Sequence, residues 1–389
     1  MTVSFLFRSA LVAVAATLVA CSAMPPAQER GANDGPHPGF PSGAVVDTDP
    51  LGPAVYRAKS RWLPVRWAEL PGVQNDTLHE AWNAWLRSCE APPAALANLC
   101  DDVRRLSIAS QDEQLHWLQN TMQPYRVESF KGRSDGLMTS YYEPEMTGSR
   151  VRTPEFSVPL YQLPRGWGTR KPWYNRQQIE TLPDAQAALV GREIAWLRDP
   201  VEALVLHIQG SGRLHVTEPD GSVRLIRLAY AGTNDQPYKS VGRWLLDRNL
   251  IKDASWPGIS AWATANPQRL QEMLWSNPRY VFFKEEPLEL LDAQFGPRGA
   301  QGVPLTPGRS IAVDRGSIPY GTPVWLYSKG TEVEYQRLVM AQDTGSAIVG
   351  AVRADYFMGW GQEAGELAGR IKQPLRLWAL WPKNVPVPK

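Results

Sequence analysis

Residues 341–369, AQDTGSAIVGAVRADYFMGWGQEAGELAG, carry two aspartates twelve positions apart, Asp343 and Asp355, in a segment rich in glycine. A third aspartate, Asp314, stands upstream in SIAVDRGSIPYGTPVWL. An aspartate near glycine is typical of a turn, because its carboxylate bonds nearby backbone and glycine adopts positive φ. Asp355 differs, because the aromatic pair Tyr356-Phe357 follows it. A carboxyl group against aromatic surface loses water and favours its protonated form, which suits general acid catalysis.

Asp314 and Asp343 each have a simpler interpretation. Asp314 ends the apolar run 311–313 and precedes a second strand-like run at 323–327, so it fits a structural turn. Asp343 begins the triplet D-T-G, which also occurs in aspartic proteases. Those enzymes need two aspartates that share one proton. This chain has a single D-T-G, so an aspartic-type protease is disfavoured.

Other chemistries lack their signatures. The five histidines show no H-E-x-x-H spacing and the cysteines form no C-x-x-C pair, so no metal is predicted. No phosphate-binding loop or dinucleotide motif is present, so no cofactor is implied. The segment from Gln209 to Gly212 is not a nucleophile elbow, because glutamine stands where the first glycine belongs. Forty-one basic against 39 acidic residues argue against a nucleic-acid partner.

Short β-type runs outnumber the helix signals. Thr77 with Glu80 and Ser110 with Glu113 match the capping box that opens a helix, and Asn266-Pro267 predicts a third helix start. The strand-like runs, bounded by Gly, Pro or Asp, are 203–208, 223–229, 310–313, 323–327, 337–341 and 376–381. Many short strands with regular turns predict β-barrels.

The first residues read as a lipoprotein signal, 1–20, followed by a tether, 21–54. Arg8 precedes the apolar stretch 10–20, which is too short to span a bilayer. Leu18-Val-Ala-Cys21 resembles the bacterial lipobox, in which cleavage leaves a lipidated cysteine, and by the sorting rules Ser22 implies the outer membrane. An ordinary secretion signal with a chance cysteine is the alternative. The following Pro-, Gly- and Ala-rich residues predict a flexible segment with a reach of about 30 Å.

The two remaining cysteines, Cys89 and Cys100, suit a disulfide in an oxidising periplasm. The sequence does not show whether their Cβ atoms meet, so two buried free thiols stay an alternative.

Several ordered segments resemble one family, the membrane-bound lytic murein transglycosylase A family, whose C-terminal part is called the 3D domain after three aspartates. Besides the aspartate region, the similar segments are GLMTSYYEP at 136–144, PLY at 159–161, HIQGSG at 207–212, YAG at 230–232, YVFF at 280–283 and LTPGRS at 305–310. Together they extend from about residue 60 to residue 385.

The resemblance implies a mainly β fold with a few peripheral helices. Residues 55–145 and 282–389 would form a double-psi β-barrel domain, with the 3D region at about 310–382. Residues 146–281 would form an inserted, smaller β-barrel-like domain. Phe282 is expected to re-enter the barrel, and a glycan strand would lie in the groove between the two domains.

The resemblance also implies a reaction, cleavage of the β-1,4 bond between N-acetylmuramic acid and N-acetylglucosamine in peptidoglycan. A hydrolytic glycosidase needs two carboxyl groups. In a lytic transglycosylase the muramoyl C6 hydroxyl attacks C1 instead and leaves a 1,6-anhydro end, so one carboxyl group suffices as acid and then base. By resemblance that group is Asp355.

Other residues are expected around Asp355. Asp343 and Asp314 are expected to support it; Asp343 would hold the loop or raise the proton affinity of Asp355 through like charge. The expected sugar contacts are Thr139, Tyr142, Gln209 and Ser211, although packing alone would also explain each of them.

The chain departs from the family pattern D-T-G-G-A-I-K-G at two positions between the aspartates. Ser346 replaces the second glycine and Val349 replaces the lysine, while Met358 stands where an aromatic residue is usual. Loss of the lysine removes a cation from the site, and Arg353 is an alternative source. A lipoprotein that binds peptidoglycan without cutting it is therefore the second hypothesis, and the retained Asp355 favours the enzyme.

Overall fold

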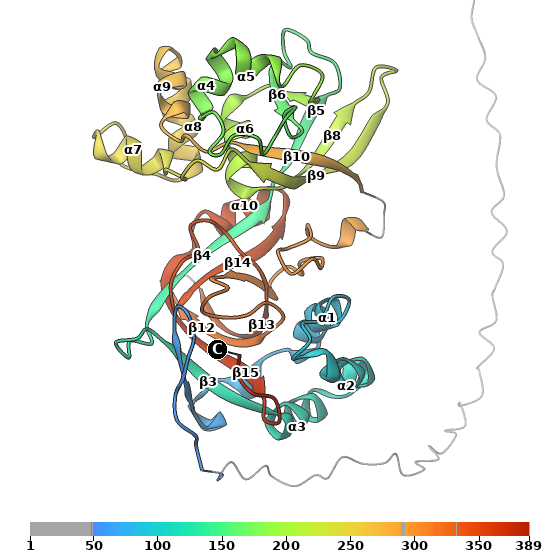
Figure 1. The fold of residues 1–389 in the computed structure, drawn as a ribbon, viewed down its shortest axis with the longest axis vertical. Coiled ribbons are helices and arrows are strands. Elements are labelled where there is room, and N and C mark those ends of the chain that lie inside the picture. Colours follow the sequence, from blue (N-terminus) through green and yellow to red (C-terminus); the bar gives the residue numbers. More distant parts are fainter. Residues whose placement is uncertain (1–47, 49, 289–291, 332, 389) are drawn as a thin grey trace, which may run out of the picture. The chain divides into compact units, whose positions relative to one another are not determined.

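The computed structural model describes residue 48 and residues 50–288, 292–331 and 333–388. The fold is mainly β, with one nine-stranded and one six-stranded sheet (Figure 1). The expected signal segment and Cys21 lie outside the described residues, as does most of the expected tether.

The larger sheet forms a barrel. Its strands follow the order β1-β2-β3-β15-β12-β13-β11-β14-β4, and β4 pairs again with β15, which joins the last six strands into a ring. The bounds are β1 Val55–Tyr56, β2 Arg61–Pro64, β3 Met122–Glu128, β4 Gly136–Glu143, β11 Ser310–Val313, β12 Pro323–Lys329, β13 Glu334–Asp343, β14 Arg353–Trp360 and β15 Lys372–Pro382. Strands from both ends of the chain therefore build one barrel, as the resemblance implies.

Three helices that lie beside the barrel in Figure 1 are held together by tryptophans: α1 Leu78–Ser88, α2 Cys100–Arg105 and α3 Gln111–Thr121. The rings of Trp82, Trp85 and Trp117 lie with centroids 5.4 to 5.9 Å apart. The structure contains the expected disulfide between Cys89 and Cys100, with the Sγ atoms 2.08 Å apart. This bond joins the end of α1 to the start of α2.

The smaller sheet has the order β10-β9-β8-β5-β7-β6. Its strands are β5 Glu145–Ser149, β6 Val158–Tyr161, β7 Glu193–Leu197, β8 Gly212–Thr217, β9 Val223–Thr233 and β10 Val281–Pro287. The α-helices of this part are α4 Arg176–Thr181, α5 Pro183–Ala187, α6 Pro200–Gln209, α7 Val241–Asp247, α8 Trp256–Ala265 and α9 Leu270–Trp275. One face of α6 packs into the sheet core through Ala203 and Leu206, and its other face meets α7, α8 and α9 through Val201 and Leu204.

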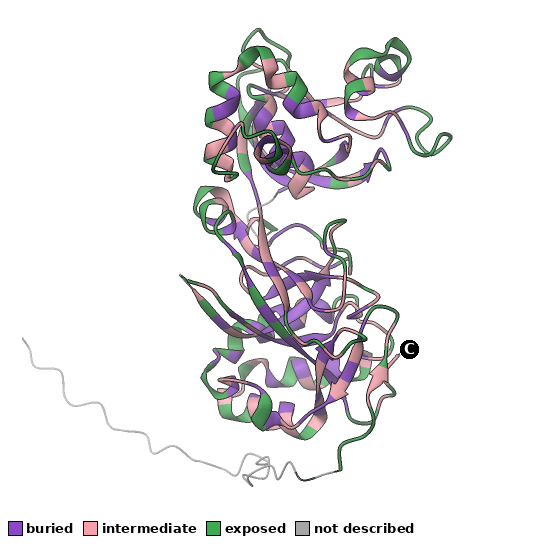
Figure 2. Ribbon diagram, turned by 90° about the vertical axis from the view of Figure 1, so that its left-hand side faces the viewer, coloured by how far each residue is buried: buried purple, intermediate pink, exposed green. Residues whose placement is uncertain are grey.

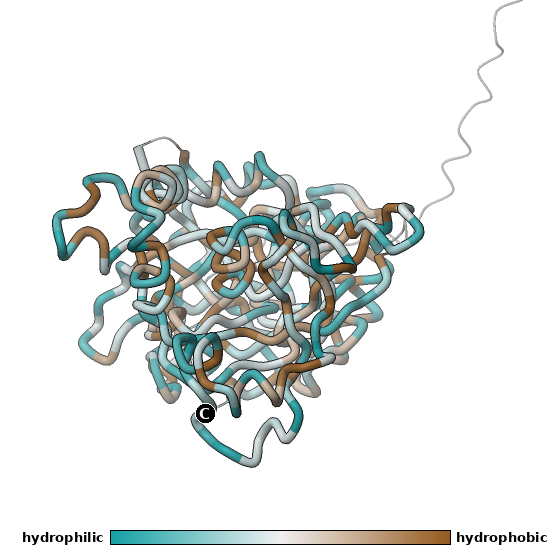
Figure 3. The backbone as a smooth tube through the Cα atoms, turned by 90° about the horizontal axis from the view of Figure 1, so that it is seen from above, coloured by the Kyte–Doolittle hydropathy of each residue, from teal (hydrophilic) through white to brown (hydrophobic). Residues whose placement is uncertain are grey.

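The remaining helices are short. Helix α10, Gly361–Ala368, packs on β4 and β14 of the barrel. The 3-10 helices are Trp67–Glu69, Val73–Asn75, Ala97–Leu99, Leu106–Ile108, Pro267–Arg269 and Asp292–Gln294. Buried positions run along the strands of both sheets in Figure 2, and many peripheral loops are hydrophilic in Figure 3.

Three expectations about local structure were wrong. Residues 203–208 belong to helix α6, because the Asp199 side chain caps the Val201 N–H at 2.7 Å and Gly210 ends the helix with a φ of 85°. The Thr77 side chain makes no capping bond to α1, whereas Ser110 and Glu113 form the expected capping box of α3. Phe282 lies in β10, which pairs with β9, so the smaller sheet extends to Pro287.

Candidate active site

One row of residues crosses five neighbouring strands of the barrel. Asp343 of β13 lies opposite Ala312 of β11, Ala312 opposite Asp355 of β14, Asp355 opposite Thr139 of β4, and Thr139 opposite Lys372 of β15. Residues directly opposite each other point to the same face of a sheet. We call this set the aspartate row.

The aspartate row lies on the outer face of the barrel. The neighbouring row, Ala354, Met138 and Gln373, points to the other face, since successive residues of a strand alternate. Those three residues are buried, while Asp355 and Thr139 are partly exposed and Lys372 is exposed.

Asp355 is held by a chain of two hydrogen bonds. The Thr139 hydroxyl donates to Asp355 Oδ1, and Arg353 Nη2 donates to the same hydroxyl oxygen at 2.8 Å. A hydroxyl has one proton. Because the Thr139 oxygen accepts a hydrogen bond from Arg353, its proton points to the Asp355 carboxyl group. Burial raises the pKa of Asp355, while the Thr139 hydrogen bond and the Arg353 charge oppose that rise. The net raised pKa favours a protonated carboxyl group, which is what a general acid requires.

Asp343 has protein donors on both oxygens. The Tyr141 hydroxyl donates to Oδ2 at 2.8 Å, and the Ala300 N–H donates to Oδ1 at 3.0 Å. Burial raises the pKa of Asp343, these hydrogen bonds lower it, and the charge of Asp355 raises it further. Asp343 thus ties the segment before β11 to the barrel, and the Asp355 charge acts on the Asp343 carboxyl group.

Asp314 anchors the loop that joins β13 to β14. Its Oδ1 accepts from the Gly316 N–H at 2.9 Å, and its Oδ2 accepts from the Gly350 N–H at 2.8 Å. The first bond closes its own turn, and the second fixes residue 350 between the two site aspartates. The geometry is that of a structural residue.

The four expected sugar contacts occupy different places. Thr139 is in the aspartate row, whereas the neighbouring Tyr142 points to the other face of β4 and its ring lies against Gly365 of α10. The Gln209 side chain accepts a hydrogen bond from the Tyr142 backbone N–H at 3.2 Å. Ser211 is 8% exposed, next to the start of β8. The structure brings only Thr139 into contact with Asp355 among these four.

Sequence reasoning missed Tyr141 and Lys372. Tyr141 lies two residues from Thr139 on β4 and therefore on the same face; its ring packs on Phe357 with centroids 5.3 Å apart. A strand assignment for 136–143 would have selected Tyr141 over Tyr142. Lys372 joins the row only through the register of β15 with β4, which no local pattern carries.

A buried ion cluster joins the end of β4 to the smaller sheet. Glu143 is fully buried and accepts from Arg213 Nε at 2.8 Å and Arg227 Nε at 2.7 Å. Both guanidinium groups also donate to the Phe295 carbonyl oxygen, at 3.0 and 2.6 Å. Arg213 lies 3.9 Å from the ring centroid of Trp360, the last residue of β14. Buried charges persist only when fully paired, so this cluster fixes both sheets at the end of the site strands.

Among the described residues, no group of three or more His, Cys, Asp and Glu side chains is placed to hold a metal ion. A cavity of about 420 Å³ opens between the turn after β12 and the start of β15, and neither Asp343 nor Asp355 lines it.

Comparison with known families covers the smaller sheet and the strands of the larger sheet from β4 onward. The family description "MltA specific insert domain" matches residues 137–284, and the description "3D domain" matches residues 309–381. The second match contains all three aspartates.

Curated relatives are named membrane-bound lytic murein transglycosylase A. The protein of Vibrio cholerae is 32% identical over 262 residues, 64% of this chain and 66% of the relative. The protein of Escherichia coli K12 is 32% identical over 267 residues, 66% of this chain and 68% of the relative. The match therefore spans about two thirds of each relative.

Solved structures match over a larger share. The lytic transglycosylase LtgG of Burkholderia pseudomallei is 43% identical, with 86% of this chain and 100% of that chain covered and a TM-score of 0.58. MltA from Neisseria gonorrhoeae is 31% identical, with 87% and 97% covered and a TM-score of 0.72. E. coli MltA with bound chitohexaose is 25% identical, with 80% and 91% covered and a TM-score of 0.65. This chain belongs to the membrane-bound lytic murein transglycosylase A family.

Proposed function

We propose that this protein is a peptidoglycan lytic transglycosylase in which Asp355 is the single acid and base. Family membership supports the activity. One observation supports the residue: within the described part of the chain, Asp355 Oδ2 has no hydrogen-bond donor, whereas both oxygens of Asp343 are occupied. Asp355 thus has an oxygen free to exchange a proton with a substrate.

The reaction balances with one carboxyl group. Protonated Asp355 donates its proton to the glycosidic oxygen, and the bond from that oxygen to the muramoyl C1 breaks. The muramoyl C6 hydroxyl attacks C1 and closes the 1,6-anhydro ring. The Asp355 carboxylate takes the C6 hydroxyl proton and returns to its starting form. No water is consumed, so the second carboxylate of a hydrolase is not needed.

The glycan strand is proposed to lie along the outer face of the barrel beside the inserted part, with Thr139 as a contact on that face. The contacts expected at Gln209 and Ser211 stay predictions, whereas Tyr142 points to the other face of β4 and lies against α10. The chitohexaose bound to the E. coli relative supports an oligosaccharide ligand of this kind. The domain division is proposed to be a barrel, 55–143 with the C-terminal part, and an insertion that begins with β5 at Glu145 rather than at residue 146.

A lipid anchor at Cys21 is proposed to hold the protein at the periplasmic face of the outer membrane. The names of the relatives include "membrane-bound". In the part of the chain that the structure describes, no helix has the length and apolar character needed to cross a bilayer. An acyl anchor followed by the Pro- and Gly-rich segment would tether the catalytic part without embedding it.

The test is digestion of purified sacculi by a soluble form that lacks residues 1–21, with mass spectrometry of the fragments. We expect muramoyl ends that are lighter than hydrolytic products by one water. Asp355→Asn should abolish cleavage while binding persists, and its melting temperature should stay close to that of the wild type, since asparagine keeps the size of the side chain and an oxygen that accepts from the Thr139 hydroxyl. Reducing ends would indicate a hydrolase, intact sacculi with bound protein would favour the binding lipoprotein, and equal cleavage by Asp355→Asn would refute the assignment.

A further inference from the structure

Lys372 is a cation at the end of the aspartate row. It is the first residue of β15 and pairs with Thr139, whose other neighbour is Asp355. Two strand spacings separate the Cα atoms of Lys372 and Asp355, which corresponds to about 10 Å. The three side chains share the outer face of the barrel, so a ligand over Asp355 lies within the range of a flexible lysine side chain.

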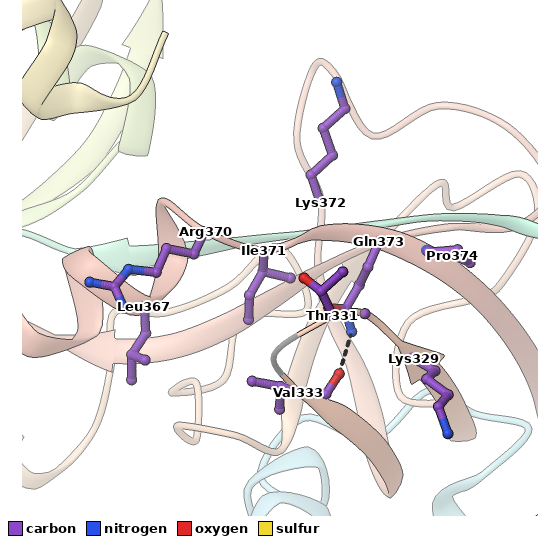
Figure 4. Close-up of a pocket in the computed structure, with 10 residues that line it drawn as sticks. Lys329, Thr331, Val333, Leu367, Arg370, Ile371, Lys372, Gln373 and Pro374 are labelled. Atoms are coloured by element: carbon purple, nitrogen blue, oxygen red, sulfur yellow. Dashed lines mark hydrogen bonds between the residues drawn. The ribbon is translucent and has the colours of Figure 1, made fainter. Parts of the chain in front are cut away.

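The Lys372 ammonium is directed into solvent. Lys372 is one of the residues that line the cavity after β12, and Figure 4 shows its side chain extending away from those of Val333 and Ile371, which line the same cavity. The residue is exposed, and within the described ranges no hydrogen bond or ion pair engages its ammonium group. A charged group with no partner among the described residues is available for a ligand.

Arg353, the other cation beside Asp355, is occupied. Its Nη1 donates to the Ala354 carbonyl at 2.6 Å and its Nη2 donates to Thr139 at 2.8 Å. Val349, which stands where the family pattern has lysine, is 61% exposed in the loop before β14 and carries no charge. Of the three positions considered, only Lys372 therefore presents a cation that a substrate anion can reach.

We propose that the Lys372 ammonium binds a carboxylate carried on the lactyl substituent of the muramoyl residue. This inference rests on the proposed function, since it narrows the substrate of the same site to glycan strands that bear carboxylates. The carboxylate has two possible sources: the lactyl group itself where the peptide has been removed, or the stem peptide where it is present. In both cases the ion pair orients the strand over Asp355. A neutral chitooligosaccharide has no carboxylate, so its binding does not depend on the Lys372 charge.

The experiment measures dissociation constants in the cleavage-deficient Asp355→Asn background. The three ligands are glycan strands with stem peptides, strands stripped of peptide by an amidase, and chitohexaose. Lys372→Gln removes the charge and Lys372→Arg keeps it. Arg376→Gln is the matched control, because Arg376 is an exposed cation on the same strand and face, about 13 Å further along.

We expect Lys372→Gln to weaken binding of at least one anionic ligand about fivefold at low salt, as for an exposed ion pair. Lys372→Arg should restore the affinity, and the loss should shrink as salt increases. The anionic ligand that responds identifies the source of the carboxylate.

An equal loss for chitohexaose and for the anionic strands would overturn the proposal, as would a loss no larger than that of Arg376→Gln. The two failures are separable, because cleavage by Asp355→Asn counts against the proposed function, whereas the ratios of dissociation constants test Lys372 alone.

Discussion

Replacement of Thr139 by valine tests the hydrogen-bond chain that sets the acidity of Asp355. Valine keeps the shape of threonine but removes the hydroxyl that donates to Asp355 Oδ1 and accepts from Arg353. A hydrogen bond to a charged group is worth about 1.5–3 kcal/mol. Its loss therefore raises the pKa of Asp355, because the carboxylate loses more stabilisation than the protonated form does. The direction follows from the bond, which stabilises the carboxylate.

The shift has a definite sign in the rate. If Asp355 must start protonated, kcat/KM is constant at low pH and falls as the pH rises through the pKa of Asp355. In Thr139→Val this fall should move to higher pH. The variant would then retain a larger share of its maximal rate in alkaline buffer than the wild type does, even if the maximum itself is lower.

The assay is the pH dependence of kcat/KM for release of anhydro-muramoyl fragments. Thr139→Ser is the control, because it keeps the hydroxyl and should keep the wild-type profile. A fall at unchanged or lower pH in a folded Thr139→Val protein would refute the role assigned to the hydroxyl.

Two further predictions concern stability. Asp314→Asn puts an amide donor in place of one of the two oxygens that accept from the Gly316 and Gly350 N–H groups. We expect the free energy of unfolding to fall by about 1–3 kcal/mol while cleavage is retained. Unchanged denaturant midpoints would contradict this prediction. His207 is buried with its Nδ1 2.9 Å from Arg176 Nη2, and burial, followed by the Arg176 charge, holds the pKa of His207 well below 6.5. In the unfolded protein His207 takes up a proton below about pH 6.5, whereas in the folded protein it does not. The free energy of unfolding should therefore be level above that pH and decline by up to about 1.36 kcal/mol per pH unit below it. Melting temperatures from pH 8 to pH 5 test this, and a flat profile would show that His207 titrates normally.

Four barrel strands were predictable, because short apolar runs between turn residues specify them locally. Residues 310–313 match β11, and the runs at 323–327, 337–341 and 376–381 lie inside β12, β13 and β15. The apolar run 203–208 has no clear period, and the helix signals at its ends, Pro200 and Gly210, were the decisive ones.

The site was predictable only in part. Asp343 and Asp355 lie in one short segment, so their proximity follows from the chain itself. The partners Thr139, Tyr141 and Lys372 come from β4 and β15, more than two hundred residues apart in the case of Thr139 and Lys372. Their meeting depends on the register between these strands, which is a property of the closed barrel.

The buried cluster around Glu143 makes the inserted part a module with a defined connector. The chain leaves the barrel at Glu143. The two guanidinium groups that donate hydrogen bonds to this carboxylate belong to Arg213 and Arg227, which lie on strands of the insertion. A chimera that grafts another insertion onto this barrel must bring both arginines with it. Without them Glu143 would remain as an uncompensated charge at the junction. The free energy of unfolding of the chimera would then fall by about 3–5 kcal/mol, before any glycan contact is considered.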